Sequence, residues 1–150
     1  TEDGRLFTWG NSDQGKLGHG PTHSEADPTF DSLALPRHVK GLLERVCVMD
    51  VSLGTHHSAC IDIHGKVYTW GSGWQGKLGL GTTENQDTPQ RVLALQFLNI
   101  SAVSCGACHT LFVTSDGDVY VCGRGDARLG LGETSDRLIP QLNTFLRSAG

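Results

Sequence analysis

Short runs of apolar and β-branched residues follow one another along the chain, separated by turns rich in glycine and aspartate. Runs of this length between turn residues are typical of β-strands. Two pairs of runs flank His64-Gly65 and Asp116-Gly117, dipeptides that suit two-residue hairpin turns. Helical periodicity is weak, because Pro36 interrupts the stretch 33–45 that has some apolar residues. Strands are therefore predicted at 45–51, 59–63, 66–70, 100–104, 111–114 and 119–122, with edge strands in the short stretches after Pro36, Pro89 and Pro140.

These runs belong to an internal repeat. Residues 4–10 (GRLFTWG) return as 65–71 (GKVYTWG) and as 117–123 (GDVYVCG), and each copy continues into a glycine-rich tail. The second and third copies start 52 positions apart, whereas the first and second start 61 apart, because the first carries an insertion of about eight residues. The chain thus divides into units of approximately 1–56, 57–108 and 109–150, with an insertion loop at 21–35.

A four-stranded sheet of this size cannot bury its faces alone and needs a neighbour on each side. Radial stacking into a propeller, which closes with roughly 4–8 blades, provides those neighbours. The predicted fold is all-β, a partial β-propeller of four-stranded blades with about two and a half blades in this chain. We therefore expect a fragment of a larger protein or assembly, whose remaining propeller blades come from the same protein or from another chain.

Several spaced features recur in register: D-G-x-V-Y-x-W-G, then G-x-L-G-x-G, a proline, and V-x-x-G-x-x-H-[S/T]. In this order they resemble the regulator of chromosome condensation repeat, over nearly the whole chain. The resemblance implies a seven-bladed propeller of which this chain is an arc. Cys122 stands where the repeat has tryptophan, and His64 stands where it has the turn aspartate.

Composition narrows the function classes. A hydrophobic share of 37% together with 20 glycines fits a globular domain. The formal net charge of −4 gives no overall basic surface for nucleic acid, and no apolar run approaches the ~20 residues that span a bilayer. Five cysteines without a framework spacing favour free thiols. We expect an intracellular protein, cytoplasmic or nuclear, with neither a membrane nor nucleic acid as its partner.

Four familiar motifs occur in the chain, and the repeat explains two of them. Residues 105–109 (CGACH) spell a haem-attachment pattern, but the glycine and histidine are repeat positions, and neither a second axial ligand nor the four ligands of zinc are indicated. Residues 71–77 (GSGWQGK) approach a phosphate loop, yet the LGLG that follows will not start the required helix. Arg124-Gly125-Asp126 and the glycosylation sequon at Asn99 matter only outside the cell. No cofactor and no metal are expected.

His57 and His109 occupy equivalent positions in successive units. This recurrence argues against an acid–base role, since a catalytic residue is normally unique. No carboxylate pair and no Ser/His/Asp set stands out, so we expect a protein that is not an enzyme. The recurrent residues are assigned to the architecture: Gly10, Gly18, Gly54, His57, Gly71, Gly79, Gly106, His109, Gly123 and Gly130.

Two features are not required by the repeat and are candidate partner-binding elements. One is the insertion loop 21–35, since insertions in propellers commonly become binding loops. The other is Trp74, whose aligned positions hold Asp13 and Asp126, because an unforced tryptophan on a loop is a plausible anchor for a protein contact. The candidate residues are Trp74, Glu25, Asp27, Phe30 and Asp31.

These observations favour a non-catalytic protein-interaction scaffold. The family resemblance implies an alternative, guanine-nucleotide exchange on a Ran-type small GTPase, in which the propeller wedges the nucleotide-binding loops of the GTPase apart. Fold-level analogy is a weak warrant for such an activity. The expected partner is a protein of unknown identity, with a small GTPase as one possibility.

Overall fold

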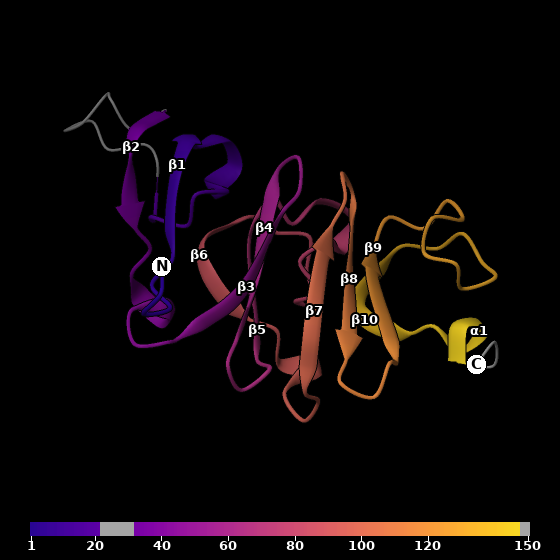
Figure 1. Cartoon of the computed structure of the whole chain (residues 1–150). Coiled ribbons are helices and arrows are strands. Elements are labelled where there is room, and N and C mark those ends of the chain that lie inside the picture. Colours follow the sequence, from indigo (N-terminus) through magenta and orange to yellow (C-terminus); the bar gives the residue numbers. More distant parts are fainter. Residues whose placement is uncertain (22–31, 148–150) are drawn as a thin grey trace.

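The computed structural model describes residues 1–21 and 32–147, which form three antiparallel sheets arranged side by side along an arc (Figure 1). Within each sheet, strands that are consecutive in sequence are neighbours in space. The predicted all-β fold with four-stranded sheets in series is confirmed. Blade 1 contains β1 (Phe7–Asn11) and β2 (Ser32–His38), blade 2 contains β3 (Val48–Leu53), β4 (His57–Asp62), β5 (Val67–Gly71) and β6 (Gln86–Arg91), and blade 3 contains β7 (Ile100–Cys105), β8 (His109–Thr114), β9 (Val119–Gly123) and β10 (Arg137–Leu142).

The first strands of blades 2 and 3 lie against each other, since β7 contacts both β3 and β4. The 3-10 turns η3 (Gly41–Leu43) and η5 (Leu93–Leu95) follow the outermost strands β2 and β6 and return the chain to the first strand of the next blade. Two further 3-10 turns, η1 (Asp13–Gly15) and η4 (Trp74–Gly76), open the glycine-rich tails, and the short helix α1 (Thr144–Arg147) follows β10.

The hairpins were predicted with two-residue turns, but each loop has three residues. In the β4–β5 hairpin, Asp62 N–H donates to the carbonyl of Lys66 (3.0 Å), which leaves 63–65 as the loop. Gly65 closes it with a φ of +69°, a left-handed conformation that glycine adopts without strain. The Asp62 carboxylate accepts the N–H groups of His64 (2.8 Å) and Lys66 (2.9 Å), and this side-chain turn favours the longer loop.

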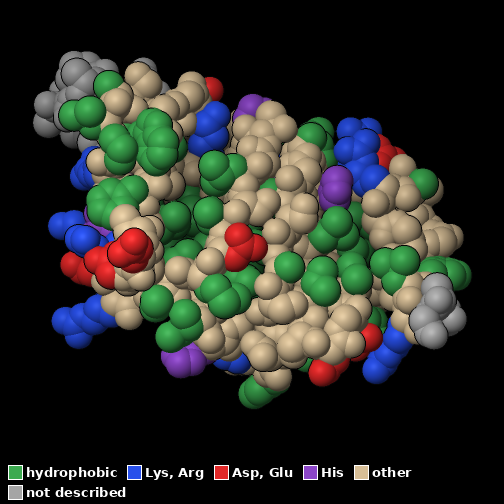
Figure 2. Space-filling view, in the orientation of Figure 1, with side chains coloured by type: hydrophobic (Ala, Val, Ile, Leu, Met, Phe, Trp, Pro, Cys, Tyr) green, Lys and Arg blue, Asp and Glu red, His purple; other side chains and the backbone are tan. Residues whose placement is uncertain are grey.

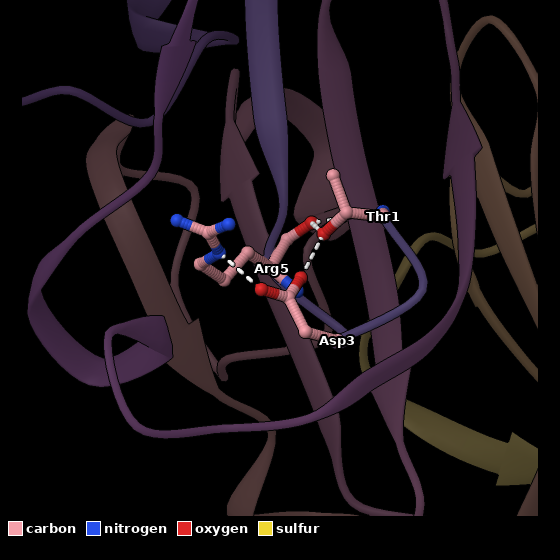
Figure 3. Close-up of polar contacts among 3 residues, drawn as sticks. All are labelled: Thr1, Asp3 and Arg5. Atoms are coloured by element: carbon pink, nitrogen blue, oxygen red, sulfur yellow. Dashed lines mark hydrogen bonds and ion pairs between the residues drawn. The ribbon is translucent and has the colours of Figure 1, made fainter.

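The turn at Asp3-Gly4 has the same construction. Thr1 lies opposite Arg5, with its amino group 3.2 Å from the Arg5 carbonyl and Gly4 N–H donating to the Thr1 carbonyl at 3.0 Å. Figure 3 shows the side chains closing this turn: Asp3 accepts from the Thr1 hydroxyl and pairs with Arg5 Nε at 2.6 Å. The hydrogen bond from Thr1 is the main cause that lowers the pKa of Asp3 to about 2.

The three prolines of the repeat lie inside outermost strands and not before them, which corrects the prediction from sequence. Pro36 is in β2, Pro89 in β6 and Pro140 in β10. An outermost strand pairs on one side only, so a residue without an N–H group is tolerated there.

The core lies between the blades. One cluster, formed by Leu6, Val39, Leu43, Cys60, Tyr68 and Trp70, joins blades 1 and 2. The other joins blades 2 and 3 and is formed by Ala59, Ile61, Val67, Val92, Leu95, Ile100, Val103, Phe112 and Cys122. Each sheet is thus stabilised mainly by its neighbour, as stacking of repeats requires.

The insertion loop was predicted at 21–35, and its last residues, 32–35, belong to strand β2. Glu25, Asp27, Phe30 and Asp31 lie outside the described residues. No helix among residues 1–21 and 32–147 is long and apolar enough to cross a bilayer. All five cysteines are free thiols.

Candidate functional site: the blade joints and the Trp74 surface

The glycine-rich tails of blades 1 and 2 each present one backbone carbonyl to the following blade. The carbonyl of Lys16 accepts hydrogen bonds from Ser58 Oγ (2.8 Å) and from Trp70 Nε1 (2.9 Å). In the next joint the carbonyl of Lys77 accepts from Thr110 Oγ1 (2.6 Å), and Cys122 Sγ lies 3.5 Å away. Cys122, the departure from the tryptophan of the repeat, therefore keeps the position and the direction of the contact with a weaker donor.

The tail glycines allow the blades to approach closely. A Cβ atom at Gly18 would lie 2.9 Å from Trp70 Nε1, and one at Gly79 would lie 3.0 Å from Pro140 and 3.2 Å from Cys122 Sγ. Both glycines have left-handed φ angles, +78° and +71°. The close contact with the next blade and the left-handed backbone conformation each disfavour any residue other than glycine at these positions.

Residues 71–77, which match part of a phosphate-loop pattern, use two of their backbone N–H groups within the protein. Gly73 N–H donates to Asn85 Oδ1 (3.0 Å), and Gly76 N–H donates to the carbonyl of Gly73 (2.9 Å). Because these N–H groups are satisfied within the loop, they are not available to an anion.

His57 is fully buried between blades 2 and 3. Its Nε2 lies 2.7 Å from Thr110 Oγ1, whose own proton goes to the carbonyl of Lys77. The hydroxyl must therefore accept, so Nε2 carries the proton and Nδ1 is bare. Nδ1 faces Gly54, where a Cβ atom would lie 2.7 Å away, and it has no hydrogen-bond partner.

Burial is the main cause that lowers the pKa of His57 from its ordinary 6.5 to about 3, and the nearby Lys77 lowers it further. A second proton on Nδ1 would be enclosed without an acceptor and close to a positive charge. His57 is thus held neutral and contributes a structural hydrogen bond, with no access to a substrate.

The haem-like residues 105–109 are also part of this joint. Cys105 N–H donates to Ser52 Oγ (2.9 Å) in the neighbouring blade, and burial raises the pKa of the Cys105 thiol to about 11. The ring of His109 lies against Gly106, as the ring of His57 lies against Gly54. Among the described residues, no group of three metal-ligating side chains is placed to hold an ion.

The integrin-type tripeptide is paired within its own loop. The Asp126 carboxylate forms ion pairs with Arg124 Nε (2.7 Å) and Arg128 Nε (2.6 Å). Asn99, the sequon residue, accepts the Ser115 N–H at its backbone carbonyl (2.9 Å).

In blade 3 one hydrogen-bond donor of the repeat is lost and another residue replaces it, an exchange that the sequence alone did not reveal. In blades 1 and 2, Thr8 and Thr69 donate to the carbonyl groups of the tail residues Leu17 and Leu78, at 2.6 and 2.8 Å. Blade 3 has Val121 at this strand position and so lacks the hydroxyl.

Asn143 supplies the missing donor in blade 3. Its Nδ2 donates to the carbonyls of Leu129 (3.2 Å) and Gly130 (3.1 Å). The equivalent position is Val39 in blade 1 and Val92 in blade 2.

This exchange predicts energetic coupling between Val121 and Asn143. Asn143→Val should lower the free energy of unfolding by about 1–3 kcal/mol, because it leaves a buried carbonyl without a donor. Val121→Thr in the same chain should restore about 1 kcal/mol, whereas Val121→Thr in the parent chain should not stabilise. A double-mutant cycle by urea denaturation measures this. Additive effects of the two substitutions would contradict the exchange.

Trp74 is the predicted partner-binding residue that the structure describes. It lies in η4 with its side chain 56% exposed, and the Lys77 ammonium is 5.8 Å from the ring centroid. Contacts of this kind between a cation and an aromatic face hold the ring in place, and burial lowers the pKa of Lys77. The indole is thus presented to solvent from a fixed turn, while the other four predicted residues lie outside the described part.

A second exposed aromatic residue was missed from the sequence. Phe97 is 93% exposed, in the loop after η5. Lys66 Nζ donates to the carbonyls of Gln96 (2.8 Å) and Leu98 (3.5 Å), which fixes the backbone on both sides of Phe97. A signal was present in the sequence, since the position 52 residues earlier is the polar Arg45.

Comparison with known proteins places these features in a family context. A family model described as the regulator of chromosome condensation (RCC1) repeat matches residues 3–61 and 64–113, and a second model of that repeat matches 100–127. The ultraviolet-B receptor UVR8 of Arabidopsis thaliana is 36% identical over 137 residues, which is 91% of this chain and 29% of the receptor. The human E3 ubiquitin-protein ligase HERC2 is 37% identical over 145 residues, which is 95% of this chain and 3% of the ligase. The chain thus spans less than a third of these relatives.

Solved structures share the arrangement of the blades. Human WBSCR16 superposes with a TM-score of 0.78 at 24% identity, covering 95% of this chain and 35% of that structure. Prp20p from Saccharomyces cerevisiae, described with its binding to Gsp1p and histones, gives a TM-score of 0.78 at 21% identity, covering 95% and 34%. At this identity the likeness concerns the fold, and it confirms the predicted partial propeller.

Proposed function

Because the chain belongs to the regulator of chromosome condensation repeat family, we propose that it is a propeller segment that holds a protein partner and catalyses no reaction. The fold accounts for the polar residues that recur along the repeat. His57, Ser58 and Thr110 are used between the blades. A surface for a partner must therefore come from residues that the repeat does not need.

Trp74 is the observation that supports this proposal best. It replaces an aspartate of the other units, and its indole is half-exposed above Lys77. Tryptophan on a rigid support is enriched among the residues that dominate protein interfaces. The free thiols of the five cysteines support a location inside the cell.

The partner is a protein, and a small GTPase is one candidate. Prp20p is described with its binding to Gsp1p, but the identity of 21% carries only the fold to this chain. Nucleotide exchange therefore stands second to the scaffold role, as an outcome of the experiment below.

Trp74→Ala should reduce the partner captured by the immobilised chain from cell extract by at least about tenfold, the effect of losing a residue worth about 1.4 kcal/mol. Captured proteins are quantified by mass spectrometry, and Phe97→Ala is the matched control. Phe97 is also an exposed aromatic residue, but it lies near the opposite end of the blade, beyond the β4–β5 hairpin.

Unchanged capture by Trp74→Ala, or an equal loss with Phe97→Ala, would contradict the assignment of this surface. Capture of a small GTPase that depends on Trp74 and weakens when nucleotide is added would favour the exchange role over the scaffold.

A further inference from the structure

The glycine-rich tail of blade 2 contains a buried cation that has no acid beside it. Lys77 is among the largest side chains that are almost completely buried in the protein. Its ammonium group lies 5.8 Å from the centroid of the Trp74 ring. None of the ion pairs formed by residues 1–21 and 32–147 includes Lys77. A buried charge is normally paired with an opposite one, so the described part of the chain leaves this requirement unmet.

The other two units place an acid where blade 2 has Trp74. In blade 3 the aligned residue is Asp126, whose carboxylate pairs at 2.6 Å with Nε of Arg128, the residue at the cation position of the tail. Blade 1 has Asp13 and Lys16 at the same two positions. Figure 2 shows basic side chains with an acidic one beside them above β8 and β9, where the blade 3 loop begins. In blade 2 the cation is kept, while an indole replaces the acid.

The contact between Lys77 and Trp74 lies at the surface, because the indole is half-exposed. Burial is the main cause that lowers the pKa of Lys77, so the ammonium has lost water that no anion of the described residues replaces. A carboxylate brought by a partner meets a cation whose desolvation has already occurred on folding. Pairing is therefore favoured more strongly here than at an ordinary surface lysine.

We infer that the protein partner of this surface contributes a carboxylate to Lys77 and an apolar side chain to the exposed face of Trp74. This inference rests on the proposed function, which assigns partner binding to Trp74. The carboxylate takes the role that Asp126 has in blade 3, and the apolar side chain covers an indole that is open to solvent. Charge complementarity selects this chemistry, because the unpaired ammonium attracts an acid and repels a basic group.

A peptide array tests the chemistry of the partner directly. The fluorescently labelled 150-residue chain is applied to short synthetic peptides that carry a central glutamate flanked by leucine or phenylalanine, and to the same peptides with glutamine in place of glutamate. The glutamate peptides should bind at least about tenfold more tightly than their glutamine counterparts, the effect of one charge-assisted hydrogen bond. Fluorescence anisotropy measures the dissociation constants of the best pair.

Two substitutions at Lys77 show whether its charge is responsible. Lys77→Met keeps an apolar stem without the ammonium, so the preference for glutamate over glutamine should be lost. Lys77→Arg is the matched control, because blade 3 has arginine at this position, and it should keep the preference. The ratio within each variant separates the charge from any shift of Trp74, since such a shift affects both peptides alike. Circular dichroism confirms that each variant keeps its fold.

Equal binding of the two peptide sets by the parent chain, binding of neither set, or an unchanged preference in Lys77→Met would overturn the inference. A single-stranded DNA oligonucleotide that binds more tightly than the glutamate peptides, and that depends on Lys77, would assign the cation to phosphate and likewise overturn it.

Capture from cell extract distinguishes failure of this inference from failure of the proposed function. If Trp74→Ala lowers capture and Lys77→Met leaves it unchanged, partner binding at Trp74 stands and the acidic partner is wrong. If Trp74→Ala leaves capture unchanged, the proposed function fails whatever the peptides show. Loss of capture in both Trp74→Ala and Lys77→Met, with capture retained in Lys77→Arg, is the result expected.

Discussion

Trp70→Ala is expected to lower the free energy of unfolding by about 3–5 kcal/mol, the usual effect of deleting a fully buried large aromatic side chain. Trp70 has no exposed surface, and it belongs to the cluster that joins blades 1 and 2. Its indole also donates to the Lys16 carbonyl at 2.9 Å. The substitution thus removes both the packing and one of the two hydrogen bonds that the Lys16 carbonyl accepts, and chemical denaturation measures the effect.

Trp9→Ala is the matched control, because Trp9 occupies the same repeat position in an identical TWG sequence. Its side chain is 59% exposed, so the free energy of unfolding should change by no more than about 0.5 kcal/mol. Equal losses in the two variants would show that the blade joint is not the source of the stabilisation.

The contrast between Trp9 and Trp70 shows which features of the fold could be predicted from the sequence. The spacing of the repeat was enough to predict antiparallel sheets in series, since strand periodicity and turn residues are local signals. Local signals cannot tell Trp9 from Trp70, because burial depends on which blade packs against each residue. The same limit hid the exchange between Val121 and Asn143, two residues 22 positions apart that are linked through the hydrogen bond to the tail carbonyl of Leu129.

Details of the backbone were harder to predict. The hairpin loops have three residues because side chains before the turn, such as Asp62, bind the N–H groups of the loop. Pro36, Pro89 and Pro140 are tolerated within the outermost strands because, among the described residues, nothing pairs with the outer side of those strands. In the candidate site, comparison of equivalent positions in the repeat units identified Trp74. The same comparison between Arg45 and Phe97 would have identified Phe97 as well.

Stability should fall as pH is lowered from about 6.5 towards 3, with His57 as a principal cause. Its pKa falls from 6.5 to about 3 on folding, mainly through burial. Between these values the unfolded chain binds a proton at this position that the folded chain does not bind. The free energy of unfolding therefore rises with pH across this window, by at most about 1.4 kcal/mol per unit for one group, and the contribution of His57 is constant above the window.

His57→Gln separates this contribution from that of the other titrating groups. The glutamine amide can still donate to Thr110 but carries no titrating ring, so the variant should lose much of the slope between pH 3 and 6.5. The remaining slope comes partly from His19 and His109, whose pKa values burial also lowers. Urea denaturation at a series of pH values provides the comparison, and equal slopes in His57→Gln and the parent would show that His57 is not the buried neutral base of the joint.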